Sequence, residues 1–314
     1  MEWKNHTRVT EFVLLGITSV RNLQIPLFVL FLSIYSMTLL WNIGIIFIVR
    51  LSPSLHTPMY LFISSLSFLD ICFSSAVTPK MLTDFLAEKK VISFLGCALQ
   101  VYFLCAMGST ENFLFAVMAI DRYVAICNPL LYPAVMSPRK CVLFVSGAYT
   151  FGFLHSFIET GCTFRLSFCA SNALQHFVCD VPPLLDLSCT DTRVITLVLF
   201  IFPSLVSMSS LLAILISYGY IIATVLKIAS VSGRMKTFST CASHLTAVTL
   251  TYGTVFFVYL WPSTSKELKR VATVFYTVIM PMLNPLIYCL RNNDINSAFR
   301  NIVNRRLFLT FCPI

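Results

Sequence analysis

Seven apolar stretches, each long enough to cross a lipid bilayer, constrain this 314-residue chain more than any other feature. A spanning helix needs about 20 mostly apolar residues. Apolar residues make up 57% of the chain and charged residues only 11%, whereas soluble domains carry about a quarter charged residues. The sequence therefore predicts an all-α membrane protein, a seven-transmembrane helix bundle. The predicted spans are residues 25–49, 58–79, 98–121, 141–161, 194–226, 238–262 and 271–290.

The segments around these spans divide the chain into three predicted parts. Residues 1–24 are polar apart from Phe12–Leu15, a run too short for the apolar part of a cleaved signal peptide, so the first helix should serve as the insertion signal. Residues 25–290 form the helical domain, and residues 291–314 a cytoplasmic tail. In that tail Asp294 can cap a short interfacial helix. Its apolar face would hold Ile295, Ala298, Phe299, Ile302 and Val303.

The orientation in the membrane cannot be read from Lys and Arg, which are equally numerous on the two predicted sides. Two other features place the N-terminus outside the cell. Asn5-His6-Thr7 is a glycosylation sequon, which is useful only in the secretory lumen. The cysteines of the segment 162–193 suit an oxidising compartment. We therefore expect a multi-pass protein of the plasma membrane, glycosylated at Asn5.

The segment 159–193 is a long predicted outer loop, and loops of this length are usually functional or tied by disulfides. It holds Cys162, Cys169, Cys179 and Cys189, and Cys97 begins the third span. Four cysteines allow three pairings, so their spacing leaves the pairing open. A zinc site that includes His176 is an alternative, but the spacing matches no common closed site.

Two acids fall at membrane depth without a basic partner in their spans, Asp70 in the second and Glu111 in the third. Such residues are costly there and are functional by default. Our hypothesis is a sodium or proton site at Asp70 and Glu111, with Asn42 and Asn284 nearby. The alternative is a pair of protonated acids bonded to hydroxyls such as those of Ser67 or Ser109.

Several motifs occur in a fixed order along the chain. Residues 55–60 read LHTPMY, residues 118–127 read MAIDRYVAIC, residues 234–245 read RMKTFSTCASHL, and residues 281–288 read PMLNPLIY. Together they resemble the signatures of olfactory receptors of the tetrapod class II type, within the rhodopsin-like G-protein-coupled receptors. The resemblance covers roughly residues 5–305. Tyr149 departs from the wider superfamily, which usually has Trp at the matching place.

The resemblance implies how such a chain would signal. Asp121 would hold Arg122 until activation, when Arg122 turns towards the G protein and Tyr218 becomes its polar partner. Pro285 kinks the last helix and provides a hinge that moves Tyr288. Taken singly, the Asp-Arg pair could be an anchoring charge, Tyr218 an interface residue and Pro285 a structural kink. The implied coupling residues are Asp121, Arg122, Tyr123, Tyr218, Lys236, Asn284, Pro285 and Tyr288.

The resemblance also implies two disulfides, Cys97–Cys179 and Cys169–Cys189, and a ligand cavity inside the bundle. Residues 271–290 hold no Lys for a retinal Schiff base, and residues 98–109 hold no acid to serve as an amine counter-ion. The expected cavity is apolar with a few hydroxyls, of which Ser109 and Tyr259 are the expected hydrogen-bond donors. The implied ligand-binding residues are Leu104, Cys105, Gly108, Ser109, Phe202, Val206, Tyr252, Val255, Tyr259 and Thr277.

These observations predict an odorant receptor that binds small, mostly apolar volatile molecules. By resemblance, it would activate a stimulatory, olfactory-type heterotrimeric G protein and raise cAMP. No nucleophile–base pair, phosphate loop or metal cluster is visible in the sequence, so neither an enzyme nor a cofactor is expected, apart from the possible sodium ion. No nucleic-acid partner is expected either. The alternative is a seven-helix transporter that uses Asp70 and Glu111, but the internal repeat typical of transporters is not found.

Overall fold

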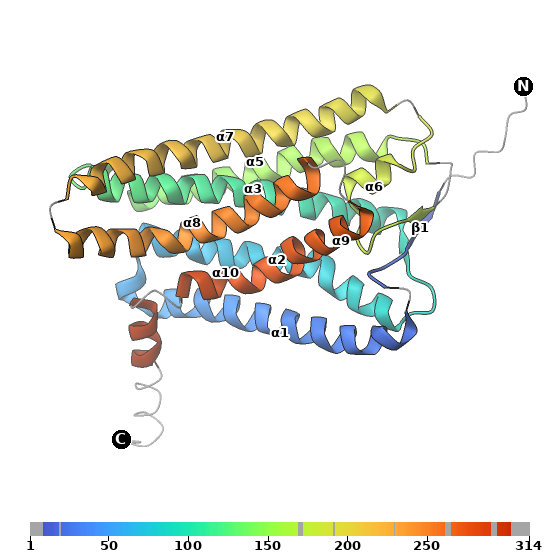
Figure 1. The fold of residues 1–314 in the computed structure, drawn as a ribbon, viewed down its shortest axis with the longest axis horizontal. Helices are drawn as coiled ribbons and strands as arrows, with labels where there is room; N and C mark the ends of the chain where they lie inside the picture. The colour runs from blue at the N-terminus through green and yellow to red at the C-terminus, as the bar shows by residue number, and fades with distance from the viewer. Residues whose placement is uncertain are drawn as a thin grey trace, which may run out of the picture.

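The computed structural model describes residues 9–18, 20–168, 172–190, 192–228, 230–260, 265–289 and 294–302. Within these ranges, the side chains at 236, 239, 240, 258–260, 266 and 289 are not described. Six of the described helices are long and apolar enough to cross a membrane. They lie side by side with α8 in a bundle (Figure 1). The predicted seven-helix architecture is confirmed.

The first six bundle helices are single segments and the seventh is built from three. The helices are α1 (Arg21–Leu51), α2 (Pro58–Leu86), α3 (Phe94–Cys127), α5 (Pro138–Phe164), α7 (Arg193–Leu226) and α8 (Val231–Leu260). The seventh consists of α9 (Lys266–Val274), a π-helical turn η2 (Phe275–Ile279) and α10 (Met280–Cys289). Pro58 and Pro138 stand at helix starts, where the missing N–H costs nothing. Ser93 caps α3 by accepting from the Gly96 N–H at 3.0 Å, which satisfies an otherwise unpaired donor.

Several helices extend further towards the outer end than the sequence predicted, among them α2 and α5. α2 continues past Pro79 to Leu86, and Lys80 pairs one turn later with Asp84, which is buried. α5 continues to Phe164, so Glu159 and Cys162, which were expected in the outer loop, belong to a helix. Charged or polar residues at the end of an apolar run do not stop a helix when they find partners at i+4 spacing.

A small three-stranded sheet, which was not predicted from the sequence, lies at the outer end of the bundle. β1 (Glu11–Leu14) pairs antiparallel with β2 (Val91–Ser93) and parallel with β3 (Ala173–Leu174). Phe12 and Leu14 are fully buried, in a cluster with residues of α3 and the 166–184 segment. The apolar run 12–15 is therefore a strand that pins part of the N-terminal segment onto the receptor, where a polar tail was expected.

Short helices close the opposite, inner end, where η1 (Pro53–Leu55) and α4 (Tyr132–Val135) connect the long helices. Residues 294–302 are helical and turn away from the bundle axis (Figure 1). Ile295 and Ala298 are buried, while Phe299 is 54% exposed, so the predicted interfacial helix is present. Tyr60 of α2 donates to Asp294 at 3.0 Å and ties this helix to the bundle.

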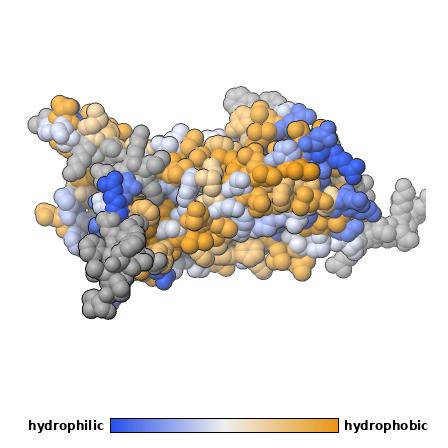
Figure 2. Space-filling model, turned by 90° about the horizontal axis from the view of Figure 1, so that it is seen from below, coloured by the Kyte–Doolittle hydropathy of each residue, from blue (hydrophilic) through white to orange (hydrophobic). Residues whose placement is uncertain are grey.

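The surface fits a lipid environment. On the face drawn in Figure 2, apolar residues dominate the middle of the molecule and hydrophilic residues gather towards its ends. Many exposed large apolar side chains lie on the long helices, for example Leu40, Phe157 and Leu215. Lipid tails solvate such a belt as well as a protein core would. α3 runs at the centre of the bundle and contacts both α5 and α7.

Candidate functional site

A cavity of about 270 Å³ lies under the outer sheet, between α3, α7, α8 and η2. Its wall is mostly apolar, as expected for a site that takes small uncharged molecules. Seven of the residues expected from the resemblance line it. They are Leu104, Cys105, Gly108 and Ser109 of α3, Val206 of α7, Val255 of α8 and Thr277 of η2.

Phe202 and Tyr252 are not among the described residues that line the cavity, and a third expected residue, Tyr259, cannot be placed. Phe202 turns towards α5, where its ring centroid lies 4.8 Å from that of His155. Tyr252 is buried, and its hydroxyl bonds to that of Ser210 at 2.6 Å, so it connects α8 to α7 away from the wall. The side chain of Tyr259 lies outside the described residues. Which face of a helix a residue occupies depends on the helix rotation, and sequence spacing alone does not fix that.

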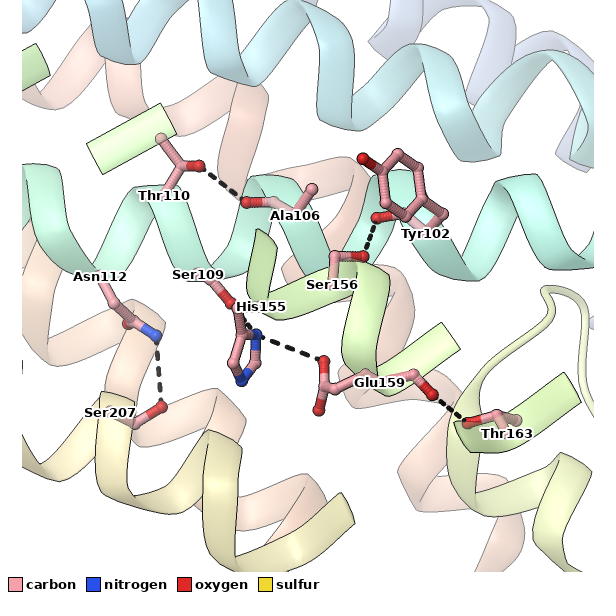
Figure 3. A network of polar contacts seen from close by, with 10 residues as sticks. All are labelled: Tyr102, Ala106, Ser109, Thr110, Asn112, His155, Ser156, Glu159, Thr163 and Ser207. Carbon is pink, nitrogen blue, oxygen red and sulfur yellow. Dashed lines mark hydrogen bonds and ion pairs between the residues drawn. The ribbon is translucent and has the colours of Figure 1, made fainter. Parts of the chain in front are cut away.

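A polar cluster forms one side of the cavity, between α3 and α5 (Figure 3). The Nδ1 atom of His155 lies 2.9 Å from the Ser109 hydroxyl and 3.5 Å from a carboxyl oxygen of Glu159. Ser109 and Glu159 both line the cavity, and Glu159 is only 6% exposed. The expectation of an apolar cavity with hydroxyls alone is therefore corrected. The missed signal was a His and a Glu four residues apart within an apolar run.

A second acid enters the cavity wall from the outer segment. Asp180 begins the short helix α6 (Val181–Leu185), and its carboxyl accepts from the Val181 N–H at 2.8 Å. Asp180 and Pro182 line the cavity from above. The sequence argument was correct that residues 98–109 of α3 hold no acid. Acids reach the cavity wall instead from α5, through Glu159, and from the outer segment, through Asp180.

The outer segment is fastened by the disulfide Cys97–Cys179, which confirms that predicted pair. Gln100 reinforces it, since its side chain accepts from the Cys179 N–H at 2.9 Å and donates to the Ala76 carbonyl at 2.9 Å. Cys189 is also disulfide-bonded, while Cys169, its predicted partner, lies outside the described residues. In the part of the chain that is described, no three His, Cys, Asp or Glu side chains are grouped to hold a metal ion.

His176 lies buried beneath the sheet, beside the ring of Phe177 at a centroid distance of 4.8 Å. Its Nδ1 atom accepts from the Val178 N–H at 3.4 Å. Burial, with a further contribution from the positive charge of Arg270, lowers the pKa of His176 to about 4. The imidazole is therefore neutral at neutral pH, because protonation would leave a charge without water.

The two membrane acids meet at Asn284 of α10. The Asn284 amide donates to both carboxyl oxygens of Asp70, at 3.1 and 3.2 Å, and it also interacts with Glu111. Tyr276 of η2 donates to Glu111 at 3.2 Å. Asn42 donates to the Thr38 and Pro281 carbonyls, both at 2.9 Å. Asp70, Glu111 and Asn284 are therefore brought together inside the bundle, while Asn42 reaches the backbone of α10 one turn before Asn284. Tyr276, which the sequence reasoning missed, also lines the ligand cavity.

At the inner end, Asp121 and Arg122 have different partners. Tyr132 donates to Asp121 at 2.9 Å, and burial together with the nearby Asp121 carboxylate raises the pKa of the Tyr132 hydroxyl. Arg122 contacts the Met59 sulfur. The ion pairs found among the described residues do not include Asp121 with Arg122. The ion pair between Asp121 and Arg122 that the resemblance implies therefore stays a prediction. In this structure the Asp121 carboxyl is bonded to the Tyr132 hydroxyl.

Three other coupling residues lie near Arg122. The Tyr218 hydroxyl and the His244 Nδ1 atom are 2.9 Å apart, and the His244 Nε2 atom lies 3.1 Å from the Phe115 carbonyl oxygen. His244 therefore joins α8 to both α7 and α3. Tyr288 of α10, one turn after Asn284 and Pro285, is buried, and its hydroxyl has no hydrogen-bond partner among the described residues. Tyr123 packs against Tyr220 with centroids 5.6 Å apart. The Lys236 side chain is not described.

Comparison with known proteins agrees with this arrangement. Residues 31–306 match the sequence model of the olfactory receptor family. The chain belongs to the olfactory receptor family. It is 51% identical over 309 residues to mouse (Mus musculus) "Olfactory receptor 5G9", covering 98% of each chain. It is also 53% identical over 304 residues to human (Homo sapiens) "Olfactory receptor 5A1", covering 96% of each chain. As an olfactory receptor it is a seven-helix membrane protein that acts through a G protein and is not an enzyme. The transporter alternative is not favoured.

Proposed function

We propose that this olfactory receptor binds small, mostly apolar volatile molecules in the cavity under its outer sheet. By binding there, the ligand would lead to activation of a stimulatory, olfactory-type G protein, and cAMP would rise. The observation that carries the proposal is the cavity of about 270 Å³. Because a small volatile molecule has few polar atoms, its binding depends mainly on removing apolar surface from water, which such a wall achieves.

The signal has a physical route from the cavity to the inner end. Tyr276 touches the cavity and bonds to Glu111, and Asn284 links that acid to Asp70. A ligand that favours one position of η2 would shift the population of receptors towards that position. Asn284 precedes Pro285 in α10, so a shift of Asn284 would move the end of α10 that carries Tyr288. Such a movement would alter the surroundings of Arg122.

The test is a cAMP assay in cells that express the receptor with the olfactory stimulatory G protein, across a broad panel of volatiles. Arg122→Ala should abolish the response, because the guanidinium is the proposed contact with the G protein. Arg139→Ala is the matched control, since it removes an exposed inner arginine at the start of α5. Surface staining must show equal display. A silent wild type across the panel, or full signalling by Arg122→Ala, would contradict the proposal.

We further propose a sodium site at Asp70 and Glu111, with Asn42 and Asn284 beside them. The residues fit a hard cation, because carboxylate and amide oxygens are suitable ligands. The Oδ1 atoms of Asn42 and Asn284 are both buried and find no hydrogen-bond partner among the residues that the structure describes, and an ion would satisfy such oxygens. When bound, the ion would supply a positive charge that holds the two acids ionised.

Asp70→Asn tests the ion site, because it removes a negative charge and keeps the size of the side chain. We expect the wild-type concentration–response curve to move when sodium replaces choline, by about three- to tenfold, and the variant's curve to stay in place. Ser74→Ala is the control, since its hydroxyl bonds only within α2. A variant with undiminished sodium dependence would exclude this site. A wild type insensitive to sodium would leave the acids as a protonated pair.

The membrane topology belongs to the same proposal: a plasma-membrane receptor with residues 1–24 outside, glycosylated at Asn5, and residues 291–314 in the cytoplasm. Asn5 lies outside the described residues. The Cys97–Cys179 disulfide supports this orientation, since disulfides persist on the oxidising side of a membrane. An epitope at the N-terminus should stain on intact cells. Asn5→Gln should remove the gel shift that a glycosidase produces in the wild type.

A further inference from the structure

We propose that the cavity selects odorants that carry a hydroxyl group, held between Ser109 and Glu159. This inference rests on the proposed odorant binding and specifies its ligand class. Its basis is the polar cluster of Ser109, His155 and Glu159 in an otherwise mostly apolar wall (Figure 3). A polar group that faces an apolar cavity costs free energy unless it is paired, so the ligand should pair with it.

Helix packing brings the cluster together. A Cβ on Gly152 would lie 2.7 Å from the Ala106 carbonyl oxygen and 2.2 Å from the Thr110 hydroxyl, so only glycine allows α5 to approach α3 this closely. Ser156, one turn further along α5, donates to the Tyr102 carbonyl at 2.5 Å. These contacts fix the rotation of α5 that turns His155 and Glu159 towards Ser109.

The position of the imidazole proton follows from its two neighbours. The His155 Nδ1 atom faces both the Ser109 oxygen and a Glu159 carboxyl oxygen. An ionised carboxyl can only accept, whereas a hydroxyl can do both. A proton on Nδ1 therefore suits both neighbours. The rings of Phe151 and Phe202, on either side, hold the imidazole in place.

With the proton on Nδ1, Ser109 accepts from His155 and its own O–H remains free to donate. The Glu159 carboxyl remains able to accept, because each carboxyl oxygen has more than one lone pair. Ser109 and Glu159 thus present one donor and one acceptor to the cavity, within 3.5 Å of the same nitrogen. A ligand hydroxyl donates and accepts at once and matches both.

Other functional groups match only part of this pair. An ether, ketone or ester accepts from Ser109 but cannot donate to Glu159. A protonated amine donates to Glu159 but leaves the Ser109 proton without a partner, and it must also lose its water in a mostly apolar cavity. The geometry therefore favours a neutral hydroxyl compound over both groups.

The experiment compares four probes with one carbon skeleton, namely a primary alcohol, its methyl ether, the aldehyde and the primary amine. The readout is cAMP, with surface staining. We expect the alcohol to have an EC50 about tenfold or more below those of the ether and aldehyde, which is the difference that one or two hydrogen bonds produce. Ser109→Ala and Glu159→Leu should each remove most of that preference while the ether response changes little.

Glu159→Gln separates hydrogen bonding from charge, because the amide keeps an acceptor oxygen and loses the negative charge. The variant should keep a measurable preference for the alcohol over the ether. Ser146→Ala is the matched control on the lipid side of α5, and it should behave as wild type.

The outcomes also distinguish this inference from the proposed function. If aldehyde or ether is as potent as the alcohol, the receptor binds odorants but the hydroxyl selection is wrong. If the amine is the most potent probe and Glu159→Gln abolishes its response, Glu159 is a counter-ion and the proposal is overturned. If a well-displayed receptor ignores the four probes and every other volatile tested, the proposed function fails together with the inference.

Discussion

The outer and inner halves of this receptor differ in the hydrogen-bond partners of their polar side chains. The outer half holds a cavity, and Ser109 and Glu159 face that open space. In the inner half, Tyr218, His244 and Tyr132 are bonded directly to other helices or to their neighbours on the chain. Polar groups that face the cavity can form hydrogen bonds to a ligand at little cost in free energy. Hydrogen bonds between helices, in contrast, must break before those helices can separate. The comparison suggests that the outer half recognises the ligand and the inner half sets the threshold for signalling.

The two halves also differ in how they are fastened. The sheet β2–β1–β3 and the Cys97–Cys179 disulfide join segments that are far apart in sequence, and the outer segment held by this disulfide lines the cavity through Asp180 and Pro182. At the inner end, side-chain hydrogen bonds from Tyr132 to Asp121 and from Tyr60 to Asp294 hold α4 and the helix of residues 294–302, and Ile295 and Ala298 of that helix pack into the core. The outer end is therefore held by a covalent bond and a sheet, whereas the contacts described at the inner end are hydrogen bonds and packing, which can rearrange without breaking a covalent bond.

The largest expected effect concerns the α3–α5 contact that shapes the cavity. Gly152→Ala would force a methyl group against the Ala106 carbonyl and the Thr110 side chain. We expect a loss of about 1–3 kcal/mol in the free energy of unfolding, since overpacking outweighs the better helix propensity of alanine. Thermal unfolding of the purified receptor measures it.

Gly147→Ala is the matched control, one helical turn or so away on α5, where an added Cβ meets nothing within 4 Å. It should be neutral or stabilising by about 0.5–1 kcal/mol, because alanine favours the helix. Equal effects of the two substitutions would show that α3 and α5 are not in the close contact described here.

A smaller effect is expected at the inner end from His244→Phe. The substitution keeps an aromatic ring and removes the bonds to the Tyr218 hydroxyl and the Phe115 carbonyl. Each such bond contributes about 0.5–1.5 kcal/mol. The resting position of α8 should therefore weaken, and ligand-independent cAMP should rise by about three- to tenfold. Unchanged or lower basal cAMP at equal surface display would show that His244 does not restrain α8.

A further expected effect is a dependence of stability on pH through His176, in the outer segment that the Cys97–Cys179 disulfide fastens. Its folded pKa of about 4 lies below the unfolded value of about 6.5, so the unfolded state binds more protons between these values. The neutral imidazole of His176 therefore contributes its full share to the free energy of unfolding above about pH 6.5. This contribution is lost as the pH falls towards 4. Stability should decrease by about 2 kcal/mol between pH 7 and pH 5.

The melting temperature of wild type and His176→Gln at both pH values measures this contribution. The variant has no titrating group at the position, so its melting temperature should change less than that of the wild type on acidification. Parallel shifts in the two proteins would assign the pH dependence to other groups.

The sequence predicted the inner half better than the outer half, for physical reasons. A membrane span is a local property of about 20 consecutive residues, and the inner motifs are contiguous, so both are visible along the chain. The outer sheet joins residues 11–14, 91–93 and 173–174, and these short runs become strands only after the helices bring them together. Glu159 falls where the predicted fourth span and the predicted outer loop overlap, and the structure places it inside α5, beside His155. Phe202 was expected in the cavity, but the rotation of α7 turns it to His155.

In our account, the outer half recognises the ligand and the inner half couples to the G protein. Full cAMP concentration–response curves for wild type, Leu104→Phe and Arg122→Ala, at equal surface display, test this division of roles between the halves. Leu104→Phe adds volume to the cavity wall, so it should raise the EC50 by about tenfold and leave the maximum unchanged. Arg122→Ala should abolish the maximum while the receptor still binds ligand. A lowered maximum with an unchanged EC50 in Leu104→Phe would contradict recognition at the outer cavity, and a pure EC50 shift in Arg122→Ala would contradict coupling at the inner end.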